Sequence, residues 1–101
     1  MFFKPLQVAQ DLTLPGGCEN LVNRTLTAFG RIDILVNSAG IFSNALITDE
    51  NYFDVFNAVT AINEIATIRM IKLSAPSLSK TTGSVISIAS IAATITPVLF
   101  T

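Results

Sequence analysis

The sequence predicts an α/β chain built around a parallel β-sheet. An amphipathic helical pattern over residues 18–29 is followed at once by a short apolar run at 32–36. A second helical stretch, which ends near Leu78, is followed by another apolar run at 84–88. A helix that leads directly into a short apolar strand indicates a βαβ unit, and such units build parallel sheets.

Composition indicates a part of a larger α/β protein. The chain has 101 residues, which is one small domain at most. Half of the residues are hydrophobic and 13% are charged, whereas about 25% are charged in an ordinary soluble domain. Such a chain can fill a core but has little polar surface to cover it. We therefore interpret residues 1–101 as one incomplete domain.

Charge and residue types exclude several classes of function. The net charge is −1 and the six basic residues are scattered, so we expect no nucleic-acid partner. The chain contains no histidine and a single cysteine, Cys18, which excludes a zinc site and a Ser-His-Asp triad within it. A lone cysteine fits a reducing compartment, and the start of the chain lacks the apolar run of a secretory signal. We expect a cytoplasmic protein.

The first third of the chain reads as a strand end followed by a helix. Residues 6–9 form a short apolar run that ends near Asp11, and residues 15–17, Pro-Gly-Gly, open the helix. Gly30 stands where a left-handed C-cap belongs. The apolar face of this helix recurs at helical spacing and comprises Cys18, Leu21, Val22, Thr25, Leu26 and Phe29.

The rest of the chain predicts two strands around a long helical stretch. Residues 32–36 and 84–88 read as strands that are buried on both faces. Residues 41–47 read as a loop, and residues 48–50, Thr-Asp-Glu, as a helix start. From there to Leu78 the pattern is helical, as one helix or as two with a bend, and residues 81–83 form a turn.

Small polar residues follow three of the predicted strands. They are Asp11, the segment 37–40 (Asn-Ser-Ala-Gly) and the segment 87–90 (Ser-Ile-Ala-Ser). In an open parallel sheet the carboxyl ends of the strands face the ligand crevice, so this joint placement predicts one crevice. Ordinary turn or capping chemistry is the alternative for each segment taken alone. Asn63 lies on the apolar stripe of the long helix, where a hydrogen-bonded core asparagine is the simpler interpretation.

These residues resemble the short-chain dehydrogenase/reductase family across essentially the whole chain. The resemblance rests on residues 11–13 (Asp-Leu-Thr), on residues 29–40 (Phe-Gly-Arg-Ile-Asp-Ile-Leu-Val-Asn-Ser-Ala-Gly), on Asn63, and on residues 75–78 and 83–90. It implies a partial Rossmann-like, doubly wound parallel sheet that lacks the first two strands and the C-terminal part of the family's fold.

The resemblance also implies roles for single residues. Asp11 and Leu12 match the segment that contacts the adenine of NAD or NADP. Asn37, Ser38, Ala39 and Gly40 match the segment along the ribose, with Ser38 where the family usually has asparagine. Asn63 and Ser90 match residues of the catalytic machinery: Asn63 supports a proton-relay water, and Ser90 polarises the substrate oxygen. The implied reaction moves a hydride between nicotinamide and a small alcohol or carbonyl substrate.

Several parts of the family pattern are absent from these 101 residues. They contain no glycine-rich phosphate turn, and the Tyr-x-x-x-Lys element is expected just beyond Thr101. The single tyrosine, Tyr52, does not match it. We therefore expect a piece of an oxidoreductase that is inactive alone. Because the first predicted strand has no neighbour here, we expect only the later two strands to pair, with large apolar faces uncovered and poor folding or aggregation.

Two other interpretations remain open. The chain is a non-catalytic short isoform that pairs with a full-length relative, since the family's long helices pair subunits and its members are expected to be homo-oligomers. Alternatively, residues 81–101, which carry no charge over 21 positions, anchor a small membrane protein. Serine, threonine and proline within that stretch, and the lack of a flanking basic cluster, argue against the anchor, so we expect no membrane partner.

Overall fold

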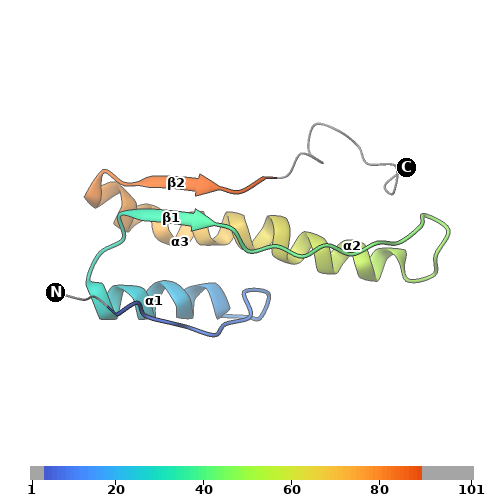
Figure 1. The fold of residues 1–101 in the computed structure, drawn as a ribbon, viewed down its shortest axis with the longest axis horizontal. Coiled ribbons are helices and arrows are strands. Elements are labelled where there is room, and N and C mark those ends of the chain that lie inside the picture. Colours follow the sequence, from blue (N-terminus) through green and yellow to red (C-terminus); the bar gives the residue numbers. More distant parts are fainter. Residues whose placement is uncertain (1–3, 90–101) are drawn as a thin grey trace.

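A computed structural model describes residues 4–89 of the chain. Along the chain the elements are helix α1 (Gly17–Phe29), strand β1 (Ile34–Asn37), helix α2 (Tyr52–Thr60), the π-helical segment η1 (Ala61–Ile65), helix α3 (Ala66–Thr81) and strand β2 (Ser84–Ser87). The long helical run lies behind the two strands, and α1 lies alongside α3, below β1 in this view (Figure 1). This alternation of helix and strand confirms the predicted α/β class.

The two strands form a parallel sheet, as the sequence predicts. β1 pairs with β2 in a register that places Ile34 opposite Ser84 and Asn37 opposite Ser87. Both arrows in Figure 1 therefore point the same way, and the residues that follow the two strands lie at the same edge of the sheet. That edge carries the segments 37–40 and 87–89.

The strand predicted over residues 6–9 is not observed. Residues 4–11 have no regular secondary structure, and the segment runs past α1 without pairing to β1 or β2 (Figure 1). A strand needs a neighbour for its backbone N–H and C=O groups. Among residues 4–89 no strand lies next to this segment, so its apolar sequence alone does not produce one.

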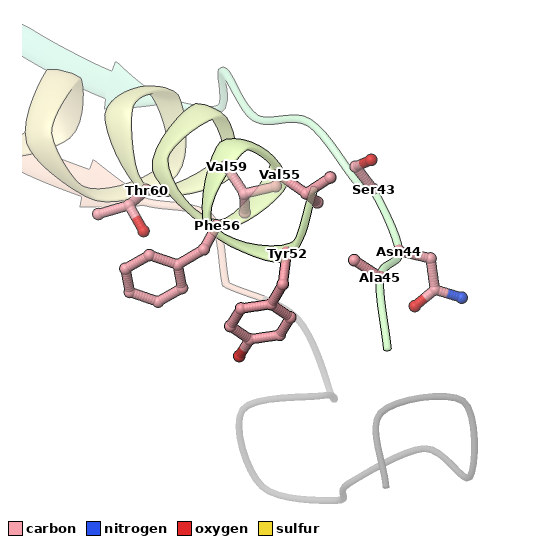
Figure 2. Close-up of a pocket in the computed structure, with 8 residues that line it drawn as sticks. All are labelled: Ser43, Asn44, Ala45, Tyr52, Val55, Phe56, Val59 and Thr60. Atoms are coloured by element: carbon pink, nitrogen blue, oxygen red, sulfur yellow. The ribbon is translucent and has the colours of Figure 1, made fainter. Parts of the chain in front are cut away.

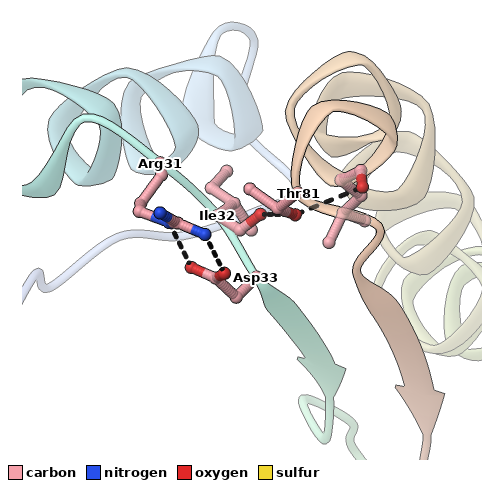
Figure 3. Close-up of polar contacts among 5 residues, drawn as sticks. Arg31, Ile32, Asp33 and Thr81 are labelled. Carbon is pink, nitrogen blue, oxygen red and sulfur yellow. Dashed lines mark hydrogen bonds and ion pairs between the residues drawn. The ribbon is translucent and has the colours of Figure 1, made fainter.

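Helix α1 ends where the sequence predicts. Gly30 adopts a left-handed conformation with φ of 74°, and its N–H donates to the carbonyl of Leu26 over 2.8 Å. The chain then passes Arg31 and Asp33, whose side chains form an exposed ion pair of 2.7 Å (Figure 3). A residue with a Cβ would be strained at the φ of Gly30, which explains the glycine at this position.

The end of α3 is fastened to the start of β1. The Thr81 hydroxyl donates to the carbonyl of Ile32 over 2.8 Å (Figure 3). The Ser84 N–H donates to the carbonyl of Asp33 over 3.0 Å. These two contacts join segments about fifty residues apart in the sequence. They determine how β2 enters the sheet beside β1.

The long helical stretch begins later than predicted and contains a π-turn. The segment 48–50 forms turns because Asp49 accepts from the Leu46 N–H over 2.8 Å, and α2 begins at Tyr52. The helix then continues without a break to Thr81, but residues 61–65 follow the wider π pattern, with the Ala66 N–H donating to the carbonyl of Ala61. One extra residue in a turn changes which side chains share a face.

The core is small and lies between α1, α3 and the start of β1. Its buried apolar members are Cys18, Val22, Ile32, Ala66, Met70 and Leu78. Packing of α1 on α3 is the main helix contact of this core. Cys18 is fully buried, and this burial raises the pKa of its thiol.

The two strands are not buried on both faces, contrary to the sequence prediction. Ile34 is 60% exposed, Val36 is 52% exposed, and every residue of β2 is exposed. The prediction of uncovered apolar faces is thereby confirmed for the described residues. Among residues 4–89 no helix combines the length and the apolar character that a membrane span requires; most of the uncharged stretch 81–101 lies outside the described residues.

Candidate functional site

The segments that follow β1 and β2 form one hollow with the long helical run. It has a volume of about 320 Å³ and lies at the carboxyl edge of the sheet. The hollow brings together two of the three segments that were predicted to share one crevice, while Asp11 borders a different hollow. It includes five of the sequence-predicted site residues. Its lining comprises Asn37, Ser38, Ala39, Gly40, Asn63, Thr67, Ser87, Ile88 and Ala89.

Asn37 joins the two strand ends. Its backbone carbonyl accepts a hydrogen bond from the Ile88 N–H over 2.9 Å, which extends the pairing of β1 and β2 beyond the strands themselves. Its side-chain Nδ2 is buried, and no acceptor for it exists among residues 4–89. A buried amide donor without an acceptor is costly, so this group is available for an oxygen brought by a ligand.

Asn63 holds the loop that follows Gly40. Its Oδ1 accepts from the Ile41 N–H over 2.8 Å, and its Nδ2 donates to the Ile41 carbonyl over 2.9 Å. Both ends of the amide thus bind one residue of the loop. The residue is exposed, so the expectation of a core asparagine is wrong; its hydrogen-bond partners are supplied by a neighbouring loop and not by a buried network.

Gly40 lets this loop approach the helix. A Cβ placed on Gly40 would lie 3.3 Å from the Oδ1 of Asn63, which is closer than ordinary van der Waals contact. A Cβ here would therefore require the Asn63 amide to shift by a few tenths of an ångström. Glycine at position 40 accommodates the close approach of the loop backbone to the Asn63 side chain.

The π-turn places Asn63 and Thr67 beside the strand ends. Asn63 lies within η1, and the Thr67 hydroxyl donates to its carbonyl over 3.4 Å. Sequence reasoning missed both Thr67 and the π-turn. The only signal for Thr67 was its position four residues after Asn63, one helical turn along the same face. π-turns often occur at functional sites because they change local side-chain direction.

Asp11 borders a second hollow of about 340 Å³, which it shares with Thr13, Ile41, Ala58, Ala61 and Ile62. Its Oδ1 accepts from the Thr13 hydroxyl over 2.6 Å and from the Thr13 N–H over 2.9 Å. These bonds lower the pKa of the Asp11 carboxyl, so it stays ionised. The contact is the turn chemistry that the sequence offers as an alternative.

Leu12 lies outside the lining of this second hollow, whereas Ile41 belongs to it. Leu12 packs against the core, and its carbonyl accepts a hydrogen bond of 3.5 Å from the Cys18 thiol. Ile41 lines the hollow of Asp11, and its backbone is the group that Asn63 binds. The two hollows are therefore neighbours across Ile41. Ser90, the remaining site residue that the sequence predicts, lies outside the described residues.

A third hollow, of about 230 Å³, lies between the loop at 43–45 and helix α2 (Figure 2). Tyr52 borders it, with its ring parallel to that of Phe56 at a centroid distance of 6.5 Å. Tyr52 is thus absent from the lining of the hollow at the strand ends. This placement agrees with the mismatch of Tyr52 to the catalytic tyrosine of the family pattern.

Comparison with known proteins places this geometry in a family. The family model described as short chain dehydrogenase matches residues 3–101. The chain belongs to the short-chain dehydrogenase family. Membership accounts for the parallel sheet with its helices, because relatives with solved structures share this fold over 83% to 88% of the chain.

Relatives are longer than this chain. It is similar to the L-fucose dehydrogenase of Mus musculus, with 35% identity over 81 residues, which are 80% of this chain and 30% of the mouse protein. A short-chain dehydrogenase/reductase of unknown function from Caenorhabditis elegans, solved with cofactor, matches with 33% identity and a TM-score of 0.74 over 83% of this chain and 32% of its own. The structure of the KRED1-Pglu enzyme matches with 27% identity and a TM-score of 0.80 over 88% and 37%. The chain spans about a third of these proteins.

Proposed function

We propose that this chain forms one wall of the active site of an oxidoreductase that uses NAD or NADP. The reaction transfers a hydride between the nicotinamide and a small alcohol or carbonyl substrate. The observation that carries the proposal is the hollow at the carboxyl edge of the sheet, where Asn37, Gly40 and Asn63 meet. Ligands of open parallel sheets bind at that edge.

The residues of this hollow fit a ribose and the ring attached to it. Ala39 has a small side chain and Gly40 has none, so a flat ligand can approach the backbone at these two residues. The orphaned Nδ2 of Asn37 and the hydroxyl of Ser38 can bond to sugar oxygens. Asp11, ionised beside the neighbouring hollow, offers an acceptor to an exocyclic amine of a base.

Within this proposal the protein provides position and polarity. The bound dinucleotide supplies the hydride chemistry. The side chain of Asn63 fixes the loop after β1 by binding Ile41. The backbone carbonyl of Asn63 accepts a hydrogen bond from the Thr67 hydroxyl. Ser90 is proposed to bind the substrate oxygen. We propose that the 101 residues are inactive alone, since an acid/base group matched to this reaction is needed and Tyr52 borders a different hollow.

A graft tests this function. In the graft, the whole 101-residue chain replaces the matching third of the C. elegans relative that was solved with cofactor. We expect the graft to oxidise NADH or NADPH in the presence of small ketones and aldehydes, and the isolated chain to show no turnover. Absence of turnover in a folded graft that binds cofactor would contradict the catalytic role. Turnover by the isolated chain would contradict its proposed inactivity.

A second candidate function is pairing with another subunit, and one observation favours it. The helical run from α2 to α3 leaves Phe53, Ile65 and Ile68 between 45% and 71% exposed. Apolar residues in such number on one helix are typical of a subunit contact. We therefore also propose that the parent protein is a homo-oligomer, and that this chain associates with a full-length relative through that helix.

Cytoplasmic location is proposed from the unpaired Cys18.

A further inference from the structure

Thr67 is bonded to Asn63 at the hollow that follows the strands. Both residues belong to the long helical run, and both line the hollow of about 320 Å³. The Thr67 hydroxyl donates to the backbone carbonyl of Asn63 over 3.4 Å, and Thr67 is half-buried. The two residues are one helical turn apart, so a change in one side chain acts on the other residue directly.

Helix α1 of the same chain offers a comparison for this bond. The Thr25 hydroxyl on α1 donates to the carbonyl of Leu21, also four residues earlier, over 2.9 Å. Bonds of this kind compete with the backbone bonds of a helix and often bend it. The bond of Thr67 is longer, and its acceptor lies in the π-helical segment η1 and not in a regular helix. The same residue spacing therefore meets a different backbone at Thr67.

The π-turn shifts the backbone donors just before Thr67. The Ala66 N–H donates to the carbonyl of Ala61, five residues earlier, whereas an α-helix would direct it four residues back. π-turns are rare inside helices and often occur at functional sites. Thr67 is the second residue of α3, so its hydroxyl links Asn63 in η1 to the regular helix that follows.

Asn63 is held from two sides. Its amide binds both backbone groups of Ile41 over 2.8 and 2.9 Å, and its carbonyl accepts from Thr67. The ideal Cβ position of Gly40 lies only 3.3 Å from the Oδ1 of Asn63, so the loop backbone passes close to this amide. A movement of the Asn63 backbone is therefore passed to the loop after β1.

We propose that Thr67 is a positioning residue, whose hydroxyl holds the Asn63 carbonyl in the π-turn and thereby aims the Asn63 amide at Ile41. This inference rests on the proposed function and adds a residue to the wall of the same hollow. Thr67 acts through Asn63 and the loop, so its loss changes the geometry of bound reactants more than their affinity. A small misplacement of reacting groups lowers the rate strongly.

Amide exchange in the full 101-residue chain tests the positioning role without a ligand. Thr67→Val keeps the shape of the side chain and removes its donor, so the Ile41 amide should exchange about fivefold faster. Thr67→Ser keeps the donor and should stay within about twofold of the original chain. Thr25→Val removes the matching hydroxyl on α1 and should leave the exchange of Ile41 unchanged. Unchanged exchange in Thr67→Val, or equal acceleration by Thr25→Val, would overturn the proposal.

Kinetics of the graft described above test the role of Thr67 in turnover. We expect Thr67→Val to lower kcat on the order of tenfold while the KM for NADH or NADPH stays within about twofold. Thr67→Ser should recover most of kcat. A graft that turns over equally well with Thr67→Val would overturn the proposal. A graft without turnover would contradict the proposed function instead, and the exchange of Ile41 then decides the role of Thr67.

Discussion

Asn63 gives the loop after β1 its position by binding both backbone groups of Ile41. Substitution Asn63→Ala removes an acceptor for the Ile41 N–H and a donor for its carbonyl, at 2.8 and 2.9 Å. We expect the amide of Ile41 to lose its protection from hydrogen exchange, with a cost in local stability of about 1 kcal/mol per bond. Asn57→Ala, an exposed asparagine on α2, is the matched control and should leave Ile41 protected.

The effects of substitutions at Gly40 and Asn63 on the local stability around Ile41 should not be additive. A Cβ at Gly40 lies 3.3 Å from the Asn63 Oδ1, so Gly40→Ala should weaken the same contact. In the Asn63→Ala background the added methyl group has no amide to displace. A double-mutant cycle on Ile41 exchange should therefore give a smaller effect of Gly40→Ala in that background. Additive effects would show that Gly40 acts independently of Asn63.

Asp11 should titrate below the ordinary aspartate range. Its carboxylate accepts two bonds from Thr13, and these lower its pKa. Because the folded pKa is the lower one, the stabilising contribution is complete above the unfolded value near 3.9 and is lost as the pH falls through the folded value. Thr13→Val removes the hydroxyl donor, so the pKa of Asp11, measured by carbon NMR, should rise toward the unfolded value. An unchanged pKa would contradict this cause.

Much of the site at residue scale was predictable from sequence. Segment 37–40 was predicted to line the crevice because strand ends are local properties, whereas the place of Asn63 in the site was predicted only from the resemblance to the family. The partner of Asn63 was not predictable, since Ile41 is 22 residues away and the contact depends on the loop. Thr67 was missed because the π-turn that accompanies it has no distinct sequence pattern.

Among the elements, the junction of α3 with β1 includes a hydrogen bond from one hydroxyl. Thr81 donates to the Ile32 carbonyl over 2.8 Å and also lies 3.2 Å from the Leu78 carbonyl. Thr81→Val keeps the shape but leaves the Ile32 carbonyl without this donor, which should lower the free energy of unfolding by about 1 kcal/mol. Thr81→Ser keeps the hydroxyl and should retain most of this free energy of unfolding. Chemical denaturation measures both, and equal loss in the two variants would exclude the hydrogen bond as the cause.

Element prediction from sequence succeeded where the interactions are local. Helix α1 and its Gly30 cap follow from helical spacing and from a glycine at positive φ. The segment 6–9 shows the limit, because an apolar run becomes a strand only beside another strand. The start of α2 was misplaced because the Asp49 carboxylate binds Leu46 and stabilises a turn.

For the molecule as a whole, the exposed sheet should dominate behaviour in solution. Ile34, Val36 and Ile88 are each more than half exposed, and such patches promote association. We expect the isolated chain to bind a hydrophobic dye and to melt over a broad range. Ile34→Thr with Val36→Thr should reduce dye binding at unchanged helix content, whereas Val22→Ala in the core should reduce helix content. A monomeric chain that melts cooperatively would contradict this expectation.

Cofactor affinity of the graft described above tests most directly whether the hollow at the strand ends is the nicotinamide–ribose site. Ala39→Phe fills this hollow, while Phe29→Ser changes an exposed residue on α1 and is the control. We predict that Ala39→Phe raises the dissociation constants for NADH and NADPH at least about tenfold, on the order of 1.4 kcal/mol, at an unchanged melting temperature. Equal affinity in Ala39→Phe and the unmodified graft would contradict the assignment of the hollow.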